Sequence, residues 1–287
     1  MQEGKKPTMK PFIRKTAYTG PLQSVVLDWA GTAVDHGCTG PAAVFVNVFA
    51  QVNVAVSTGD ARRFMGLAKK EHIRQMCGLQ DVAAAWKKQH GRLPDETDVD
   101  DLYQRTAAMM VETIGRYSDP IDGVTDTVAE LRSMGIRIGS STGYVREMMD
   151  VLVPAAKSKG YHPDAIVCSS DVPAGRPFPW MCYRNAIQLG TYPMEAMVKI
   201  GDTIADIEEG LNAGMWTVGI THTGNELGMT AAEVSGLDPA DLDTRLHRID
   251  ARFRQAGAHY TLETLADIMP VIHEINQKLQ AGENPLR

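Results

Sequence analysis

An aspartate ends the first apolar segment of the chain. Asp28 follows Ser-Val-Val-Leu at 24–27 and opens a turn that contains Gly31. The apolar segment does not alternate with polar residues, which is typical of a parallel strand covered on both faces. A carboxylate at the carboxyl end of such a strand lies where open α/β sheets place their reactive groups. Asp28 is therefore predicted to be a nucleophile that forms a covalent acyl intermediate with an electrophile.

The residue two positions after Asp28 is alanine, not an acid. A carboxylic acid at position 30 would be the obvious proton donor to an oxygen leaving group. Ala30 has no proton to give. Whatever group leaves from this site must therefore leave without an acid at that position.

A second pair of carboxylates, Asp202 and Asp206, spans another predicted strand end and helix start. The spacing of four residues puts both on one side, near Asp28, where they can hold a hard cation such as Mg²⁺. Capping of the helix N-terminus is the alternative, because aspartate is favoured there. The matching strand ends at Asp28 and Thr142 favour the metal site over capping alone.

Two further features suit a phosphoryl or phosphonyl group. Thr142 and Gly143 offer a hydroxyl and a main-chain amide at a strand-to-helix turn, which is a natural phosphate cradle. An ordinary helix N-cap is the alternative there. Arg176 lies in the rigid loop 173–177, and its guanidinium fork fits such a group. A lone loop arginine is more often simply solvated, so the assignment of Arg176 depends on the other candidate residues.

A lysine stands out in a long stretch of helical pattern. One face of a helix predicted over 60–77 holds four residues: Met65, Lys69, His72 and Met76. Burial between methionines would desolvate the lysine, lower its pKa and make its amine nucleophilic. His72, one turn on, is a candidate proton shuttle. A snorkelling lysine on an ordinary amphipathic helix is the commoner arrangement and remains the alternative.

Apolar runs and amphipathic segments alternate along the rest of the chain, which predicts βαβ units. Strands are predicted at 24–28, 136–142, 165–168, 197–201 and 217–220, and helices at 124–134, 179–189 and 203–213. The fold class is therefore α/β, with a doubly wound Rossmann-like parallel sheet as its core. A capping box at 230–233 predicts another helix start. A last strand near 259–260 and a closing helix over 262–279 follow it.

The chain is predicted to divide into three parts. Residues 37–117 read as an inserted helical cap domain that opens and closes over the sheet edge. Its helices are predicted at 41–52, 60–77, 82–90 and 98–117. Residues 21–36 and 118–287 form the core domain, and residues 1–20 form a flexible N-terminal extension.

Composition narrows the classes of function. The chain has 287 residues, 44% of them hydrophobic, and a net charge of −6, enough for a large α/β domain and a smaller one. It has no dominant basic stripe, so no nucleic-acid partner is expected. Its four cysteines form no CxxC pair and are expected to be reduced thiols of a cytoplasmic protein. The first residues carry lysines but no apolar h-region, so neither a signal peptide nor a membrane partner is expected.

These motifs together resemble the haloacid dehalogenase superfamily and, within it, the phosphonatase family. Four superfamily motifs are matched in order and spacing, at Asp-Trp-Ala-Gly-Thr 28–32, Thr-Gly-Tyr 142–144, Arg176 and Gly-Asp-Thr 201–203. Longer strings resemble phosphonatases, at 27–35, 65–69, 141–150, 171–177 and 212–219. The resemblance runs from about Ser24 to the C-terminal helix. Its most specific part is the combination of Ala30 with Lys69.

The resemblance implies hydrolysis of phosphonoacetaldehyde at its carbon–phosphorus bond, giving acetaldehyde and phosphate. Lys69 would form a Schiff base with the aldehyde, and Asp28 would attack phosphorus to give an aspartyl-phosphate. The carbon would leave as an enamine, so that no acid is needed at Ala30. Mg²⁺ would be held by Asp28, the main-chain carbonyl of Ala30 and Asp202. Asp206 would orient these ligands.

The resemblance also implies supporting roles and an assembly. Thr142, Gly143 and Arg176 would bind the phosphonyl group. Four residues would surround the lysine or its proton relay: Met65, His72, Tyr144 and Cys38. Members of the family form homodimers through the cap. An apolar spacing on the first cap helix is compatible with that interface or with the cap core, at Val44, Phe45, Val48 and Phe49.

Three other functions are weighed against this one. A phosphate-ester phosphatase of the same superfamily would benefit from the acid that Ala30 lacks. A dehalogenase-like hydrolase also uses a nucleophilic aspartate without a second acid, but it has no need of the metal that Asp202 and Asp206 indicate. A catalytically silent binding protein is hard to reconcile with one set of residues: Asp28, Lys69, Thr142, Arg176 and Asp202.

Overall fold

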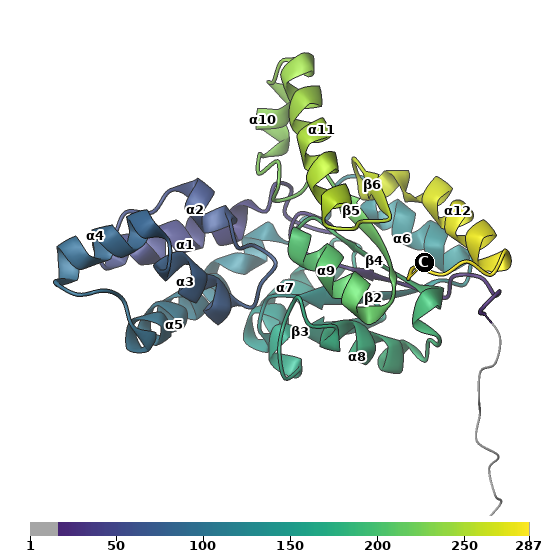
Figure 1. The fold of residues 1–287 in the computed structure, drawn as a ribbon, viewed down its shortest axis with the longest axis horizontal. Coiled ribbons are helices and arrows are strands. Elements are labelled where there is room, and N and C mark those ends of the chain that lie inside the picture. The colour runs from purple at the N-terminus through teal and green to yellow at the C-terminus, as the bar shows by residue number, and fades with distance from the viewer. Residues whose placement is uncertain (1–16, 287) are drawn as a thin grey trace, which may run out of the picture.

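The computed structural model describes residues 17–286 and is built on one six-stranded parallel sheet (Figure 1). The strands are β1 (Ser24–Leu27), β2 (Arg137–Thr142), β3 (Ala165–Cys168), β4 (Met197–Gly201), β5 (Trp216–Ile220) and β6 (Tyr260–Leu262). Their order is β3-β2-β1-β4-β5-β6, and every neighbouring pair is parallel. This confirms the predicted α/β Rossmann-like core. Most of the extension predicted at 1–20 lies outside the described residues.

The central strands bring the predicted chemistry to one edge. All residues of β1, β4 and β5 are buried, which explains why their sequences are mostly apolar and do not alternate with polar residues. Leu27 at the end of β1 pairs with Ile200 of β4 and with Ser140 of β2. The strand order changes direction at β1, because β2 and β3 lie on one side of it and β4, β5 and β6 lie on the other. Asp28 and Asp202 therefore emerge together at the edge where open α/β sheets bind ligands.

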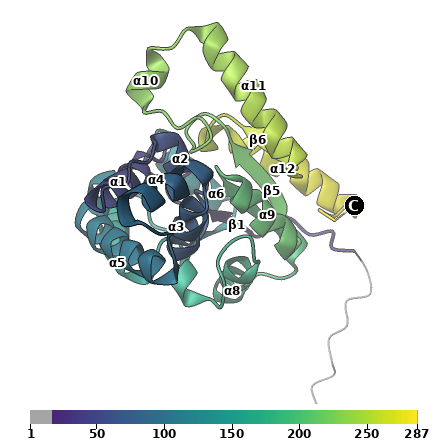
Figure 2. The ribbon, with the colours of Figure 1, turned by 60° about the vertical axis from the view of Figure 1, so that its left-hand side comes forward.

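Helices cover this sheet and extend beyond it. They are α6 (Val124–Ser133), α7 (Arg146–Ser158), α8 (Trp180–Leu189), α9 (Ile204–Ala213), α10 (Ala231–Ser235), α11 (Pro239–Gln255) and α12 (Ile268–Gln280). Helix α8 packs on β2 and β3, and α9 packs on β4 and β5. Helices α10 and α11 project from the sheet as an arm (Figures 1 and 2). The predicted capping box is confirmed, because Thr230 and Glu233 cap α10 reciprocally.

Five helices between β1 and β2 gather beside the sheet edge, and we call them the cap (Figure 1). They are α1 (Thr39–Gln51), α2 (Thr58–Arg62), α3 (Lys69–Cys77), α4 (Gln80–His90) and α5 (Glu96–Thr113), followed by the 3₁₀ turn η1 (Ile114–Tyr117). The four apolar residues of α1 that were compatible with a dimer face are all buried: Val44, Phe45, Val48 and Phe49. They form cap core within one chain.

The continuous helix predicted over 60–77 is wrong. Gly66 adopts a φ of +89°, which side chains other than glycine rarely adopt, and the chain turns there between α2 and α3. Helix α3 begins at Lys69. Met65 therefore lies in the turn and does not share a helical face with Lys69. His72 and Met76 do lie on α3 with the lysine, and all three are buried.

Two other differences concern the C-terminal part. The closing helix predicted over 262–279 begins only at Ile268, because Thr264 first caps the 3₁₀ turn η4 (Leu265–Asp267). Helix α11 was not predicted, although Asp238 caps it and proline occupies its first position, which is a common start signal. Within the described residues, no helix is long and apolar enough to cross a membrane.

Candidate active site

Asp28 lies directly after β1, and a buried arginine holds it there. Arg176 Nη2 donates to Asp28 Oδ1 and to the carbonyl oxygen of Ser141, both at 2.7 Å. Arg176 Nε donates to Glu209 Oε2 at 2.9 Å. The side chain of Arg176 is 1% exposed and that of Asp28 is 9% exposed, so water screens their attraction weakly. The Asp28 carboxylate is thus fixed through one of its oxygens.

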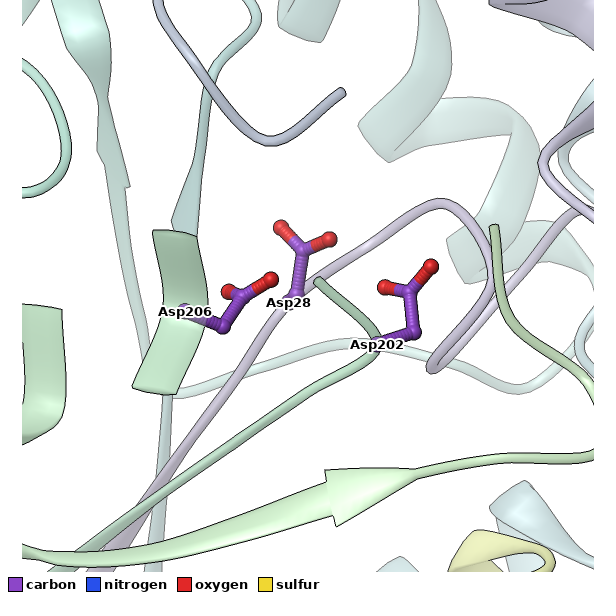
Figure 3. Close-up of side chains that lie close together, drawn as sticks. All are labelled: Asp28, Asp202 and Asp206. Carbon is purple, nitrogen blue, oxygen red and sulfur yellow. The ribbon is translucent and has the colours of Figure 1, made fainter. Parts of the chain in front are cut away.

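Three carboxylates meet at this edge (Figure 3). Ligand atoms of Asp28, Asp202 and Asp206 lie within 4.8 Å of one another, with Asp28 between the other two. The Thr32 hydroxyl and the Asn225 main-chain N–H donate to Asp202 at 2.9 and 2.8 Å. Burial first, and then the charges of Asp28 and Asp206, raise the pKa of Asp202 well above its usual value. A cation among these carboxylates would relieve that repulsion.

The charges around this cluster fit a divalent cation. Six buried charged residues form one connected group: Asp28, Asp202, Asp206, Glu209, Arg176 and Lys199. Four carboxylates and two cations leave the group two positive charges short, which one divalent ion balances. Carboxylate oxygens are also the ligands that hard divalent cations prefer. The residues present therefore fit the kind of metal that the sequence predicts.

Asp206 caps a helix, which was the alternative weighed from the sequence, and it also contacts two buried cations. It forms a capping box with Thr203 at the start of α9. Its Oδ1 also lies 3.0 Å from Arg176 Nη2 and 2.5 Å from Lys199 Nζ. Burial raises the pKa of Asp206, but Arg176 and Lys199 outweigh burial, and the pKa is lowered overall. Asp206 is thus an anion tied to the cations beneath the site.

A small cavity lies between Asp28 and the cap. Its volume is about 20 Å³, which is room for one or two water molecules. Nine of the predicted site residues line it: Asp28, Ala30, Cys38, Met65, Lys69, Thr142, Gly143, Tyr144 and Arg176. Pro41, Gly66 and Thr203 complete the lining. The structure therefore brings together candidates from the cap and from three strand ends.

Lys69 presents a buried amine to this cavity. It is 4% exposed, and burial is the main cause that lowers its pKa from 10.5 to about 8, although Cys38 and Asp28 act in the opposite direction. Its place at the first residue of α3, where the helix dipole is positive, also disfavours the ammonium form. Lys69 Nζ lies 4.7 Å from the ring centroid of Tyr144 and 5.6 Å from that of Phe45. The lysine does not snorkel to solvent, and its neutral form is accessible near pH 8.

His72 lies behind Lys69 and does not line the cavity. Its Nε2 is 2.8 Å from the carbonyl oxygen of Ala61, and its ring stacks on Phe45 with centroids 4.0 Å apart. Burial first, and Lys69 second, lower the pKa of His72 well below its usual value. The neutral ring therefore donates through Nε2, while Nδ1 is buried with no hydrogen-bond partner in the described residues. His72 joins α3 to α2.

Cys38 and Tyr144 enclose the amine as neutral groups. Burial, followed by the charge of Asp202, raises the pKa of Cys38 well above its usual value. Burial, followed by Cys38, raises the pKa of Tyr144 likewise. Thr142 Oγ1 accepts the Tyr144 main-chain N–H at 3.1 Å. The hydroxyl that the sequence marked as a phosphate ligand thus also caps the local turn.

Two glycines allow the cap to touch the core around the cavity. A Cβ at Gly66 would lie 2.3 Å from Thr203 Oγ1, and a Cβ at Gly143 would lie 2.5 Å from the Leu67 carbonyl oxygen. Both distances are far shorter than van der Waals contact. The close approach of cap and core therefore requires glycine at both positions.

Comparison with known proteins identifies the family to which this arrangement belongs. The family described as haloacid dehalogenase-like hydrolase matches residues 31–220. A phosphonoacetaldehyde hydrolase-like protein of Syntrophobacter fumaroxidans is 54% identical over 96% of this chain and 100% of its own length. A phosphonoacetaldehyde hydrolase of Nitratidesulfovibrio vulgaris is 50% identical over 96% of this chain and 99% of its own. The chain belongs to the phosphonoacetaldehyde hydrolase family.

A solved structure agrees with this membership. The crystal structure of a phosphonoacetaldehyde hydrolase-like protein from Oleispira antarctica matches with a TM-score of 0.93 at 36% identity, covering 96% of this chain and 100% of that one. The resemblance drawn from the sequence motifs is thereby confirmed. The protein is a hydrolase of the phosphonoacetaldehyde hydrolase family with the haloacid dehalogenase-like fold.

In this member of the phosphonoacetaldehyde hydrolase family, two residues of the connected charged group around Arg176 were not predicted. Lys199 lies in β4 and Glu209 on α9, and both are 0% exposed. A signal for Lys199 was present in the sequence, because a lysine inside an apolar strand that is covered on both faces is almost never tolerated without a partner. Glu209 shows only a weak signal, its position three residues after Asp206 on the same side of a helix.

Proposed function

We propose that this protein hydrolyses the carbon–phosphorus bond of phosphonoacetaldehyde, releasing acetaldehyde and phosphate. One observation carries the proposal: the Lys69 amine, with its pKa lowered to about 8, lines the same small cavity as the carboxylate of Asp28. Ester hydrolysis has no use for an amine there. The relative from Nitratidesulfovibrio vulgaris, named phosphonoacetaldehyde hydrolase, supports the choice of substrate.

The first step is formation of an imine on Lys69. The neutral amine adds to the aldehyde carbon, and one water molecule leaves. The protonated imine is an electron sink next to the carbon that bears phosphorus. Tyr144, Cys38 and Met65 line this part of the cavity and keep bulk water from the imine. The face of the Tyr144 ring favours the positive charge that develops on the lysine nitrogen.

The second step is attack of Asp28 on phosphorus. A carboxylate oxygen bonds to phosphorus as the carbon–phosphorus bond breaks, and the electron pair passes into an enamine on Lys69. The carbon needs no proton at that moment, which accounts for alanine at position 30. The enamine carbon then takes a proton, one water hydrolyses the iminium, and a second water hydrolyses the aspartyl-phosphate. The net reaction consumes one water and restores both side chains.

The phosphonyl oxygens are proposed to bind to Thr142, Gly143 and Arg176. Arg176 Nη2 is engaged with Asp28 and aligns the nucleophile, whereas Nη1 lies 3.4 Å from the carbonyl of Gly66 at the cavity. We assign Nη1 to the phosphonyl group. His72 does not reach the cavity, and we assign it the support of Lys69 on α3.

A magnesium ion is proposed for the acidic cluster. Asp28, Asp202 and the main-chain carbonyl of Ala30 would hold it, with Asp206 orienting the ligands. Bound there, Mg²⁺ would offset the phosphonate charge that opposes attack by a carboxylate.

Movement of the cap belongs to the same proposal. A cavity of about 20 Å³ does not admit the substrate, so the cap at 37–117 opens from the core at 21–36 and 118–287. We also propose that the enzyme is cytoplasmic and forms homodimers through the cap. The buried apolar residues of α1 do not provide that interface.

The decisive experiment supplies phosphonoacetaldehyde with Mg²⁺ and, in parallel, a simple phosphate ester. Release of phosphate and acetaldehyde from the phosphonate alone, lost in Lys69→Arg, would support carbon–phosphorus hydrolysis through a Schiff base. Turnover of the ester alone would make the protein a phosphatase and Lys69 a packing residue of the cap.

A further inference from the structure

Lys199 and Glu209 lie beneath the site and take no part in the steps above. Lys199 Nζ is 2.5 Å from Asp206 Oδ1, 3.1 Å from the Ile200 carbonyl oxygen and 3.8 Å from Glu209 Oε2. Both side chains are fully buried. Buried ion pairs contribute little stability over apolar residues of the same size. A purely structural role is therefore a poor reason for this pair.

Glu209 connects the pair to the arginine that holds the nucleophile. Its Oε2 accepts from Arg176 Nε at 2.9 Å and from the Ser141 hydroxyl at 2.9 Å. The hydroxyl oxygen of Ser141 in turn accepts a hydrogen bond from Arg176 Nη2 at 3.0 Å. Glu209 Oε1 is buried with no hydrogen-bond partner in the described residues. That unpaired oxygen is a cost which an apolar residue would avoid.

Asp28 and Asp206 compete for the same guanidinium nitrogen. Arg176 Nη2 lies 2.7 Å from Asp28 Oδ1 and 3.0 Å from Asp206 Oδ1. Lys199 contacts that same oxygen of Asp206 and neutralises it. Glu209 binds the Nε edge of Arg176 and fixes the plane of the guanidinium. Together they leave Asp28 as the partner that Arg176 aligns.

We propose that Lys199 and Glu209 are positioning residues for the attack on phosphorus. Lys199 pairs with the carboxylate of Asp206, and Glu209 pairs with the guanidinium of Arg176. The guanidinium can then hold the Asp28 carboxylate in line with the phosphonyl group. The inference rests on the proposed function. It assigns the pair to carbon–phosphorus cleavage in the core and not to imine formation, which takes place at Lys69 on the cap.

The test compares Lys199→Met, Glu209→Gln and the double variant with wild type, using phosphonoacetaldehyde and Mg²⁺. Steady-state phosphate release reports cleavage, and borohydride trapping at Lys69 reports imine formation. Controls are Glu208→Gln, an exposed neighbour on α9, and Lys157→Met, exposed on α7. Thermal unfolding shows whether each variant is folded.

Lys199→Met is expected to lower kcat about 100-fold, and Glu209→Gln about tenfold, with KM and imine trapping close to wild type. The double variant is expected to be at least as slow as Lys199→Met, because Glu209→Gln removes a second constraint on Arg176 while Asp206 remains without Lys199. The two controls are expected to match wild type.

Wild-type kcat in both single variants would overturn the proposal, as would imine trapping that falls in proportion to phosphate release. If Lys199→Met does not fold, Glu209→Gln decides by the same criteria. A wild-type enzyme that forms no imine would overturn the proposed function itself, and this inference with it.

Discussion

Lys69 and Asp28 require opposite electrostatic surroundings, and each has them. The amine sits among Tyr144, Cys38 and Met65, where burial favours its neutral form. The carboxylate is hydrogen-bonded to a buried guanidinium, which aligns it. The nucleophile for the aldehyde and the nucleophile for phosphorus are thus held in different surroundings within one site. A pocket that was apolar throughout would not hold the carboxylate, and one that was cationic throughout would not suit the amine.

The lowered pKa of Lys69 predicts the pH dependence of imine formation. Protonated lysine does not add to an aldehyde, so the rate of borohydride trapping is expected to rise with pH with a midpoint near 8. An unperturbed lysine would give a midpoint near 10.5. Lys70→Arg, a change at an exposed ion pair with Asp100, is expected to leave the profile unchanged. A midpoint near 10.5 in the wild type would contradict the buried-amine assignment.

Asp28→Ala is expected to separate the two chemical steps. Without a carboxylate there is no attack on phosphorus, so phosphate release is expected to fall at least about 10⁴-fold. Imine formation on the cap does not use Asp28, and trapping at Lys69 is expected to persist. Quantifying both products in the same reaction provides the measurement. Continued phosphate release from this variant would remove Asp28 from the role of nucleophile.

The strands and most helices could be predicted from the sequence, but the cap turn could not. The strands at 165–168 and 197–201 were predicted with the bounds that the structure gives, because short, mostly apolar runs between turns have few alternatives. The turn at Gly66 is different. Its residues have ordinary helical periodicity, and the sequence does not show that Gly66 adopts a positive φ and lies against Thr203, which is far away in the chain. Met65 reaches the cavity through that turn and not through a shared helical face.

Gly66→Ala is expected to hinder closure of the cap. The new Cβ would lie 2.3 Å from Thr203 Oγ1, in a backbone conformation with φ +89°. We expect kcat/KM to fall about 100-fold as Lys69 is displaced from Asp28. Gly91→Ala is the matched control, because Gly91 has a φ of +75° on the cap with nothing within 4 Å. Both variants are expected to lose about 1 kcal/mol of stability to backbone strain. Equal activity in the two would show that the approach at Gly66 is unimportant.

The whole molecule assembles its site from segments that are distant in the chain. Crossovers on both sides of β1 bring strand ends near residues 28, 142 and 202 to one edge, and the insertion after β1 carries Lys69 to the same place. The sequence predicted this convergence because parallel strands share one carboxyl edge. It did not predict the pairing of Lys199 with Asp206 and Glu209. That pairing depends on how α9 packs on β4, which no local pattern encodes.

The charge of the assembled site predicts its response to metal. Because the buried cluster is two positive charges short, Mg²⁺ at about 100 times its Kd is expected to stabilise the fold by about 2.7 kcal/mol. For a chain of this size that corresponds to a rise in Tm of about 5–10 °C. Asp202→Asn is expected to abolish both the rise and the turnover, whereas Asp126→Asn, exposed on α6, is expected to keep both. Chelation by EDTA is expected to stop phosphate release and spare imine trapping at Lys69, because the amine lies on the cap and not among the carboxylates. Full turnover in EDTA, or an unchanged Tm shift in Asp202→Asn, would rule out a metal at this cluster. Protonation of a carboxylate would then have to relieve the repulsion among the three aspartates.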